Sequence, residues 1–189
     1  MPPPVLPTHT PQHPAASFSR GLELRFALIF LLLFAVLQYG YSACQGSMLE
    51  RLVLDIATVR PSAAAINLIS PEANAQASGH RIVSPQGTLS ILNGCEGTET
   101  LFMLLAAILA FKAPWKHKLK GAAIGTLLIY GLNQIRIISL FFASQQDRKW
   151  FDLLHGTIAP TLIIVLSVLF FLWWSSANPP GNHEQTSTA

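Results

Sequence analysis

Charged side chains are scarce in this chain. Asp, Glu, Lys and Arg make up 11% of its 189 residues, whereas hydrophobic residues make up 51% and the mean hydropathy is +0.43. Soluble domains carry about 25% charged residues, so this composition excludes an ordinary soluble domain and favours an integral membrane protein. The net charge is +3, but the basic residues are dispersed and their only dense group joins two apolar stretches, which argues against nucleic-acid binding.

Cysteine is scarce as well, because Cys44 and Cys95 are the only two. They leave room for one disulfide, which would be the ordinary outcome if both faced an oxidising compartment. The chain has no evident internal repeat and no familiar zinc-binding spacing. We therefore expect no cofactor.

Long apolar stretches are what the chain does contain. Four of them, at about residues 22–41, 96–112, 119–142 and 155–174, approach the roughly 20 residues that a membrane-spanning helix needs. They predict a single membrane domain over residues 20–175. The first stretch shares features with a signal peptide, but it is long for one, so we interpret it as an uncleaved anchor.

Lys and Arg set the predicted orientation. Four lysines lie where the second stretch connects to the third, and two arginines lie at the beginning of the first: Lys112, Lys116, Lys118, Lys120, Arg20 and Arg25. Because short cytoplasmic loops are enriched in Lys and Arg, we expect both chain ends in the cytoplasm. Residues 42–94 and the connector 144–154 are then expected outside.

The remaining segments complete the predicted fold. Apolar residues at helical spacing over Met48–Val59 predict a short amphipathic helix on the membrane surface, followed by a loop after Pro61. Two β-type runs, 81–84 and 88–92, predict a hairpin. The polar tails, residues 1–19 and 176–189, are predicted to be disordered. The predicted fold class is thus an all-α membrane protein with four transmembrane helices. Its outer loop is expected to carry the short amphipathic helix and the β-hairpin.

Three reactive residues fall at one depth in this topology. Counted from the cytoplasmic ends of their helices, Cys95 and Arg136 lie roughly 25 Å up, and His155 lies roughly 28 Å up. All three are therefore predicted to converge near the outer face. A charged residue more than a turn below the end of a span is a functional candidate, because burying it in lipid is costly.

This set of residues favours nucleophilic catalysis. A thiol attacks as its thiolate, which a guanidinium, a histidine and a helix amino terminus all favour. We expect Cys95 to open the second helix and act as the nucleophile. His155 can accept the thiol proton and pass it to a leaving amine, while Arg136 holds the thiolate or the oxyanion.

Three further polar residues lie beside this set. Asn133, three residues before Arg136 on one helix face, can hydrogen-bond the guanidinium or only help helices to pack. Asp152, one turn before His155, can orient the imidazole or simply cap the helix. Glu96 is expected, with Glu99, to stabilise the positive end of the second span.

Other interpretations of the same residues stay open. Cys44 and Cys95 can form a disulfide in a membrane subunit that is not an enzyme, with Arg136 and His155 as interfacial anchors. Arg136 can instead bind an anion in a binding or transport protein. Cys95, Glu99 and His155 can be combined as metal ligands, although their spacing matches no familiar zinc pattern.

Three short blocks resemble a known family. They are Asn93-Gly94-Cys95-Glu96-Gly97, Asn133-Gln134-Ile135-Arg136-Ile137 and Phe151-Asp152-Leu153-Leu154-His155. Their order and spacing resemble the signature blocks of the exosortase/archaeosortase family, and the short chain is similar to subtypes such as exosortase H or the M type. Longer members have additional spans before the first block.

The resemblance implies a function and roles for the site residues. It implies a multi-pass protein of the bacterial inner membrane, with its active site facing the outer side. Its substrates would be exported proteins that end in a short motif, a transmembrane helix and a basic cluster. Cys95 would be the nucleophile, Arg136 the stabiliser and His155 the acid and base. Cleavage through a thioester would precede transfer to an acceptor, and membrane lipid would surround the enzyme.

Overall fold

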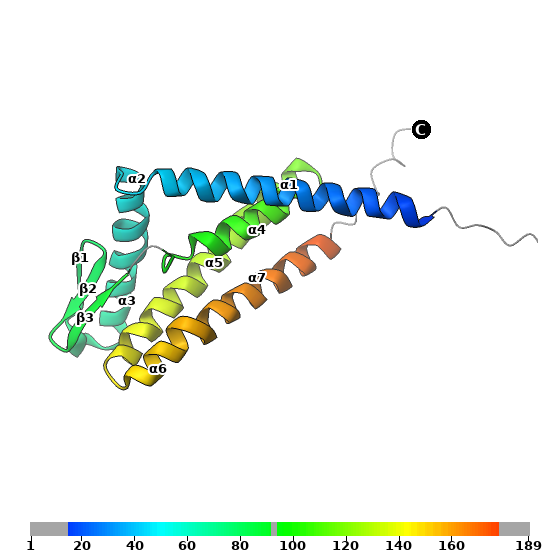
Figure 1. The fold of residues 1–189 in the computed structure, drawn as a ribbon. Coiled ribbons are helices and arrows are strands. Elements are labelled where there is room, and N and C mark those ends of the chain that lie inside the picture. Colours follow the sequence, from blue (N-terminus) through cyan, green and yellow to red (C-terminus); the bar gives the residue numbers. More distant parts are fainter. Residues whose placement is uncertain (1–14, 92–93, 178–189) are drawn as a thin grey trace, which may run out of the picture.

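The computed structural model describes residues 15–91 and 94–177, and it is mostly helical (Figure 1). The helices and strands follow in this order: α1 (Ala15–Ala43), α2 (Met48–Arg51), the π-helix η1 (Leu52–Val59), α3 (Arg60–Ile69), the 3₁₀ helix η2 (Pro71–Ala73), β1 (Gln76–Ser78), β2 (Arg81–Ser84), β3 (Gly87–Ser90), α4 (Thr98–Ala110), α5 (Trp115–Ser144), α6 (Arg148–Leu153), the π-helix η3 (Leu154–Ile158) and α7 (Ala159–Ser176). Apart from one small sheet, the predicted all-α class is confirmed.

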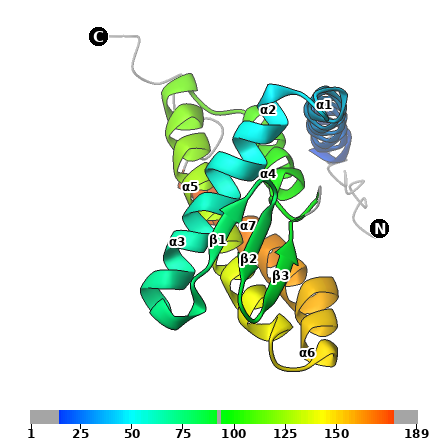
Figure 2. The same cartoon turned by 90° about the vertical axis from the view of Figure 1, so that its left-hand side faces the viewer.

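Four helices form the body of the molecule. Figure 1 shows α4 among α1, α5 and α7, and α4 contacts all three. The continuous helix of α2, η1 and α3 runs across the end of this body where α1 and α5 finish and α6 begins, with the sheet beside it (Figures 1 and 2). We call this the sheet end. The opposite end carries the turn at residues 111–114.

Close packing in the body depends on two glycines of α5. A Cβ atom at Gly121 would collide with the indole of Trp174 in α7, and one at Gly125 would lie 2.8 Å from a methyl carbon of Leu104 in α4. The small residues therefore let α4 and α7 approach the α5 backbone, as their small-xxx-small spacing predicts.

Within the described ranges 15–91 and 94–177, four helices are long and apolar enough to cross a membrane: 23–43, 48–69, 115–144 and 148–176. The set differs from the sequence prediction in one member. It includes the helix at 48–69, whereas α4 has only 13 residues, or about 20 Å. The predicted second span, residues 96–112, is thus helical over a shorter range.

The helix at 48–69 corrects the prediction of a loop after Pro61. Proline lacks a backbone N–H, so a helix that continues through it leaves an earlier carbonyl group without its usual donor. Here the Gln134 side-chain amide, from α5, donates to the carbonyl oxygen of Ala57 at 3.3 Å. The Ser62 hydroxyl also lies 2.6 Å from Gln134 Oε1. With these two hydrogen bonds to α5, the helix continues through Pro61 and ends at Ile69.

The sheet contains the predicted hairpin and one more strand. β2 and β3 pair antiparallel with Ile82 opposite Leu89, and β1 adds to β2 on the other side. Ile82 and Leu89 are buried in a core cluster that also includes Ile66 of α3. The Asn67 side chain ties α3 to the start of the sheet, because it bonds both the N–H and the carbonyl oxygen of Ala75.

Three other predicted boundaries shift. α1 begins at Ala15, so residues 15–19 of the predicted tail are helical. The predicted connector 144–154 shrinks to a turn at residues 145–147, because a helix begins at Arg148 and continues into the last span. The rest of the predicted tails lies outside the described residues, apart from Ser176 at the end of α7 and Ala177 after it.

Candidate active site

The loop at residues 94–97 carries Cys95 and Glu96 between two glycines. Gly94 and Gly97 have φ angles of 93° and 78°, in the region that favours glycine because it has no Cβ atom. The Gly-Cys-Glu-Gly sequence therefore suits this turn. The prediction that Cys95 opens a helix is wrong, because α4 begins at Thr98 with Gly97 as its amino-terminal cap. Asn93 of the same block lies outside the described residues.

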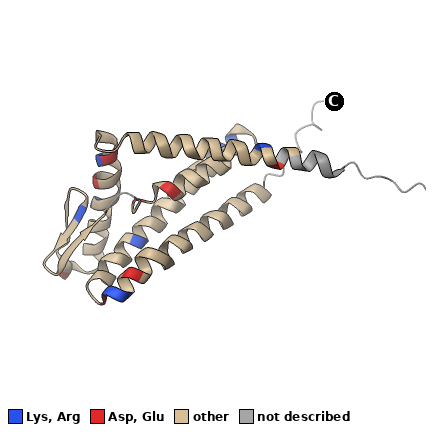
Figure 3. Cartoon of the chain, in the orientation of Figure 1, with Lys and Arg blue, Asp and Glu red and all other residues tan. Residues whose placement is uncertain are grey.

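The loop packs against α5 through Asn133. A Cβ atom added to Gly97 would lie 3.0 Å from Cγ and 3.1 Å from Oδ1 of the Asn133 side chain. Asn133 is buried, with 2% of its surface exposed. Arg136 follows three residues later, so it lies about one turn further along α5. Figure 3 shows this stretch of α5 as nearly free of charge.

His155 lies in the π-helical segment η3, one residue after its start. Its imidazole stacks on the ring of Phe151, with ring centroids 5.5 Å apart and planes inclined by 6°. Both side chains are half-buried. Stacked rings restrict each other's rotation, so Phe151 sets the plane in which the imidazole lies.

One hydrophobic cluster joins the three segments. Ile137, next to Arg136, is part of this buried cluster; Cys95 packs against it, and so do Phe151 and Leu154 on either side of His155. The structure thus gathers the loop at 94–97, the middle of α5 and the beginning of the last long helix around the same core. These are the segments that carry the three predicted catalytic residues.

Buried polar atoms without partners are concentrated in these segments. Four such atoms, Glu96 Oε2, Asn133 Oδ1, Arg136 Nε and His155 Nδ1, have no hydrogen-bond partner among the described residues. A buried polar atom left in this way costs free energy of about 1 to 3 kcal/mol, and such atoms are uncommon in folded proteins. They are groups able to bond a polar substrate.

Glu96 also belongs to a small polar cavity beside α1. The cavity has a volume of about 100 Å³ and is lined partly by Gln38, Tyr41 and Glu99. Glu96 is buried, and its Oε1 accepts a hydrogen bond of 3.1 Å from the Thr98 hydroxyl. Gln38 Oε1 is buried there as well, without a partner among the described residues, and the Tyr41 hydroxyl lies in the same cavity as Glu96.

The prediction that Asp152 caps the helix is wrong. Asp152 is exposed and lies inside α6, and the cap of that helix is Asp147, which accepts a hydrogen bond from the Lys149 N–H at 3.0 Å. Among the described residues Asp152 forms no hydrogen bond to His155. The aspartate that caps the helix lies five residues earlier, because the helix itself begins earlier than the apolar pattern indicated.

The other interpretations can also be compared with the structure. Cys44 and Cys95 are both half-buried and form no disulfide. Within residues 15–91 and 94–177, no group of three His, Cys, Asp or Glu side chains is arranged to hold a metal ion.

Two contributors to this region had no predicted role. Gln134 lies in the second signature block, and its side chain forms hydrogen bonds to the helix at 48–69. Phe151 begins the third block, at a spacing of four residues from His155 that places both on one helix face. That spacing was a visible signal for Phe151, whereas nothing local indicated that Gln134 bonds residues more than 70 positions away.

The fold and these residues define an integral membrane protein in which a thiol, a guanidinium and an imidazole come from segments around one core. The family model described as transmembrane exosortase (Exosortase_EpsH) matches residues 16–174. The chain therefore belongs to the transmembrane exosortase family, which comprises cysteine-dependent transpeptidases that act on exported proteins with carboxyl-terminal sorting signals. Comparisons with curated proteins and with solved structures gave no match.

Proposed function

We propose that this protein is a membrane cysteine transpeptidase that cleaves the carboxyl-terminal sorting signal of exported proteins and transfers the product to an acceptor. The observation that carries the proposal is the packing of three segments around one cluster, because they bring Cys95, the neighbourhood of Arg136 and that of His155 to a common core. Family membership supports the substrate class.

The proposed reaction begins at the thiol. His155 takes the proton of Cys95, and the sulfur attacks the carbonyl carbon of the scissile peptide bond, forming a C–S bond and an oxyanion. Arg136 stabilises this negative charge and keeps its own proton throughout. The C–N bond then breaks, His155 protonates the leaving amine, and a thioester remains on Cys95.

Transfer completes the cycle. A nucleophile of the acceptor attacks the thioester carbonyl carbon and gives its proton to His155. The C–S bond breaks and Cys95 returns as a thiol after reprotonation. The protein substrate is then joined through its new carboxyl end to the acceptor, and its former apolar helix stays in the membrane.

The position of the site suits a membrane-anchored substrate. We propose that α1, α4, α5 and α7 are the spans and that the helix at 48–69 lies along the outer surface. Its course across the ends of the other helices in Figure 1 supports this arrangement. A substrate held by its own apolar helix would then present the peptide just beyond that helix, at the sheet end, which we place outside the cell.

Replacement of the two cysteines tests the proposal. The substrate is an exported protein of the same genome that ends in a short motif, one apolar helix and a basic cluster. We expect Cys95→Ser to leave it uncleaved, because the hydroxyl is a far weaker nucleophile at neutral pH. Cys44→Ala should process it normally. Both outcomes are measured by the conversion of precursor to the shorter product on gels.

Alkylation before and after reduction separates the proposal from the disulfide interpretation. A quantitative bond between Cys44 and Cys95 in cells, or normal cleavage by Cys95→Ser, would overturn the proposed chemistry. A covalent adduct on Cys95 that hydroxylamine releases would support the thioester.

A further inference from the structure

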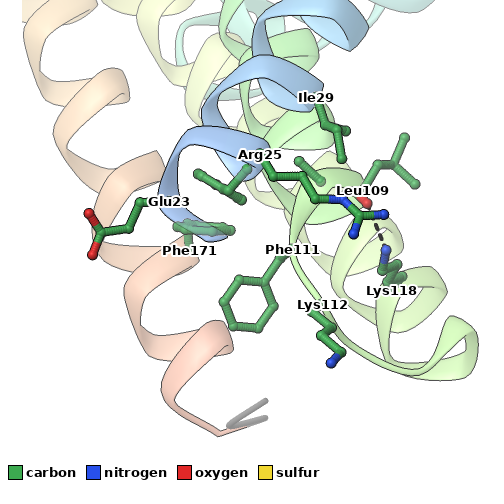
Figure 4. Close-up of a pocket in the computed structure, with 10 residues that line it drawn as sticks. Glu23, Arg25, Ile29, Leu109, Phe111, Lys112, Lys118 and Phe171 are labelled. Atoms are coloured by element: carbon green, nitrogen blue, oxygen red, sulfur yellow. Dashed lines mark hydrogen bonds between the residues drawn. The ribbon is translucent and has the colours of Figure 1, made fainter. Parts of the chain in front are cut away.

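A second, larger cavity lies at the opposite end of the bundle from the candidate active site. Its volume is about 580 Å³, and it is formed where the beginning of α1 meets the end of α4, the beginning of α5 and the end of α7 (Figure 4). Lys118 in its wall and Arg136 are 18 residues apart on α5, or about 27 Å. The proposed reaction uses none of the lining residues.

Most of the wall is apolar. Phe171 forms part of it, and the centroid of its ring lies 6.3 Å from that of Phe26 and 5.9 Å from that of Phe111. Ile29 and Ala110 continue this surface from α1 and α4. Such a wall favours hydrocarbon, because burying apolar surface is favourable.

The polar part of the lining is mainly cationic. Arg25, Lys112 and Lys118 contribute three positive charges, and Glu23 is the one carboxylate. In the view of Figure 4 the head groups of Arg25 and Lys118 point to the same side, and Glu23 projects to the other. The Lys118 ammonium donates a hydrogen bond of 2.6 Å to the carbonyl oxygen of Leu109. An ammonium has three donors, so two remain for a ligand.

We propose that this cavity binds an anionic phospholipid. Arg25 and Lys118 hold the phosphate of the head group, with Lys112 adding to the positive field, and one acyl chain lies along Phe26, Ile29 and Phe171. Basic pockets between helices at a membrane surface suit this ligand class. The apolar wall distinguishes a lipid from inorganic phosphate, which has no hydrocarbon to bury. The three cations of the lining would repel a positively charged peptide segment.

Lipid titration of the purified protein, followed by native mass spectrometry, tests this proposal. The ligands are phosphatidylglycerol, phosphatidylcholine and inorganic phosphate. We expect phosphatidylglycerol to bind most tightly and inorganic phosphate to bind only weakly. Arg25→Gln with Lys118→Gln should weaken phosphatidylglycerol binding about 30-fold, from loss of two cations at the membrane surface.

Two further variants keep the test specific. Lys116→Gln with Lys120→Gln removes the same charge from exposed positions that do not line the cavity, and it should bind phosphatidylglycerol like the wild type. Ala110→Phe fills the apolar wall and leaves every cation in place, so it should weaken lipid binding without altering the response to phosphate.

Three results would overturn the proposal. Equal affinity for phosphatidylglycerol and phosphatidylcholine would show that the negative charge of the lipid does not contribute to binding. Equal loss in the two double variants would indicate general surface attraction. Phosphate binding as tight as lipid binding, with no effect of Ala110→Phe, would assign the cavity to a free anion. Substrate cleavage is measured separately, so failure of the lipid proposal is distinct from failure of the proposed reaction.

Discussion

Arg136 is a single charged residue in the long apolar part of α5, and its Nε atom is buried without a partner among the described residues. A guanidinium presents five N–H donors in a planar fork. That geometry can hold a developing oxyanion and a second acceptor together, whereas an ammonium acts as a point charge. The chemistry at this position therefore depends on more than the presence of a positive charge.

Arg136→Lys tests this requirement. We expect substrate cleavage to fall at least about tenfold, because loss of a buried, charge-assisted hydrogen bond costs roughly 1.5 to 3 kcal/mol. The readout is the initial rate of product formation at equal protein levels. Arg60→Lys, at an exposed position at the start of α3, is the matched control and should retain activity. A wild-type rate in Arg136→Lys would make the residue an interfacial anchor.

At the scale of elements, two features of the loop at 94–97 require glycine at position 97. The φ angle of 78° strains any residue with a Cβ atom, and such an atom would press on the Asn133 side chain. The loop that carries the thiol is therefore positioned by contact with α5 as well as by its own backbone.

Gly97→Ala should displace Cys95 and lower the cleavage rate severalfold, since a residue in a left-handed conformation costs about 1 kcal/mol or more and Asn133 must also move. Gly46→Ala is a close control: Gly46 has the same φ angle of 78°, but no atom lies within 4 Å of its added Cβ. Equal rates in the two variants would show that contact with Asn133 has no consequence for the site.

Gln134 connects two elements that the chain separates widely. Its amide bonds both the Ala57 carbonyl oxygen and the Ser62 hydroxyl. Gln134→Leu should lower the free energy of unfolding by about 1 to 3 kcal/mol, because the Ala57 carbonyl oxygen loses its side-chain donor and the Ser62 hydroxyl keeps only its bond to the Thr58 carbonyl oxygen. Thermal unfolding in detergent measures this loss. Gln145→Leu, at an exposed position, should change little, and a Gln134→Leu protein of normal stability would contradict the assigned bonds.

At the scale of the whole molecule, topology is the property that decides where the reaction occurs. α5 has 30 residues and is about 45 Å long, so it can cross the hydrocarbon core of about 30 Å with both ends outside it. The lysine-rich beginning of α5 and the sheet end are thus expected on opposite sides.

Single-cysteine variants in a Cys44→Ala, Cys95→Ser background test this orientation. An impermeant maleimide should label Gln146→Cys and Glu72→Cys in intact cells, and Lys116→Cys only after permeabilisation. All three positions are exposed. Protection of Glu72→Cys together with labelling of Gln146→Cys would mean that the helix at 48–69 crosses the membrane, and our assignment of the spans would be wrong.

The sequence allowed much of this architecture to be predicted, and each failure has a physical cause. Apolar stretches of roughly 20 residues indicated the long helices, and the two β-type runs at 81–84 and 88–92 indicated the hairpin of β2 and β3. The helix beyond Pro61 was missed because its support comes from Gln134, which is distant in the chain. Asp147 was missed as a cap because the polar first turn of α6 does not resemble a membrane span. The roles of Cys95, Arg136 and His155 stay predictions.

The short length of α4 has a consequence for the competition between water and the acceptor. In the proposed arrangement, in which α4 is one of the spans, a helix of about 20 Å covers only two thirds of the hydrocarbon thickness, so the loop at its beginning would sit in a recess below the level of the lipid head groups. Bulk solvent reaches such a recess poorly. An acylated Cys95 held there would survive longer, and an amphiphilic acceptor that can enter sideways from the bilayer would have the kinetic advantage over hydrolysis.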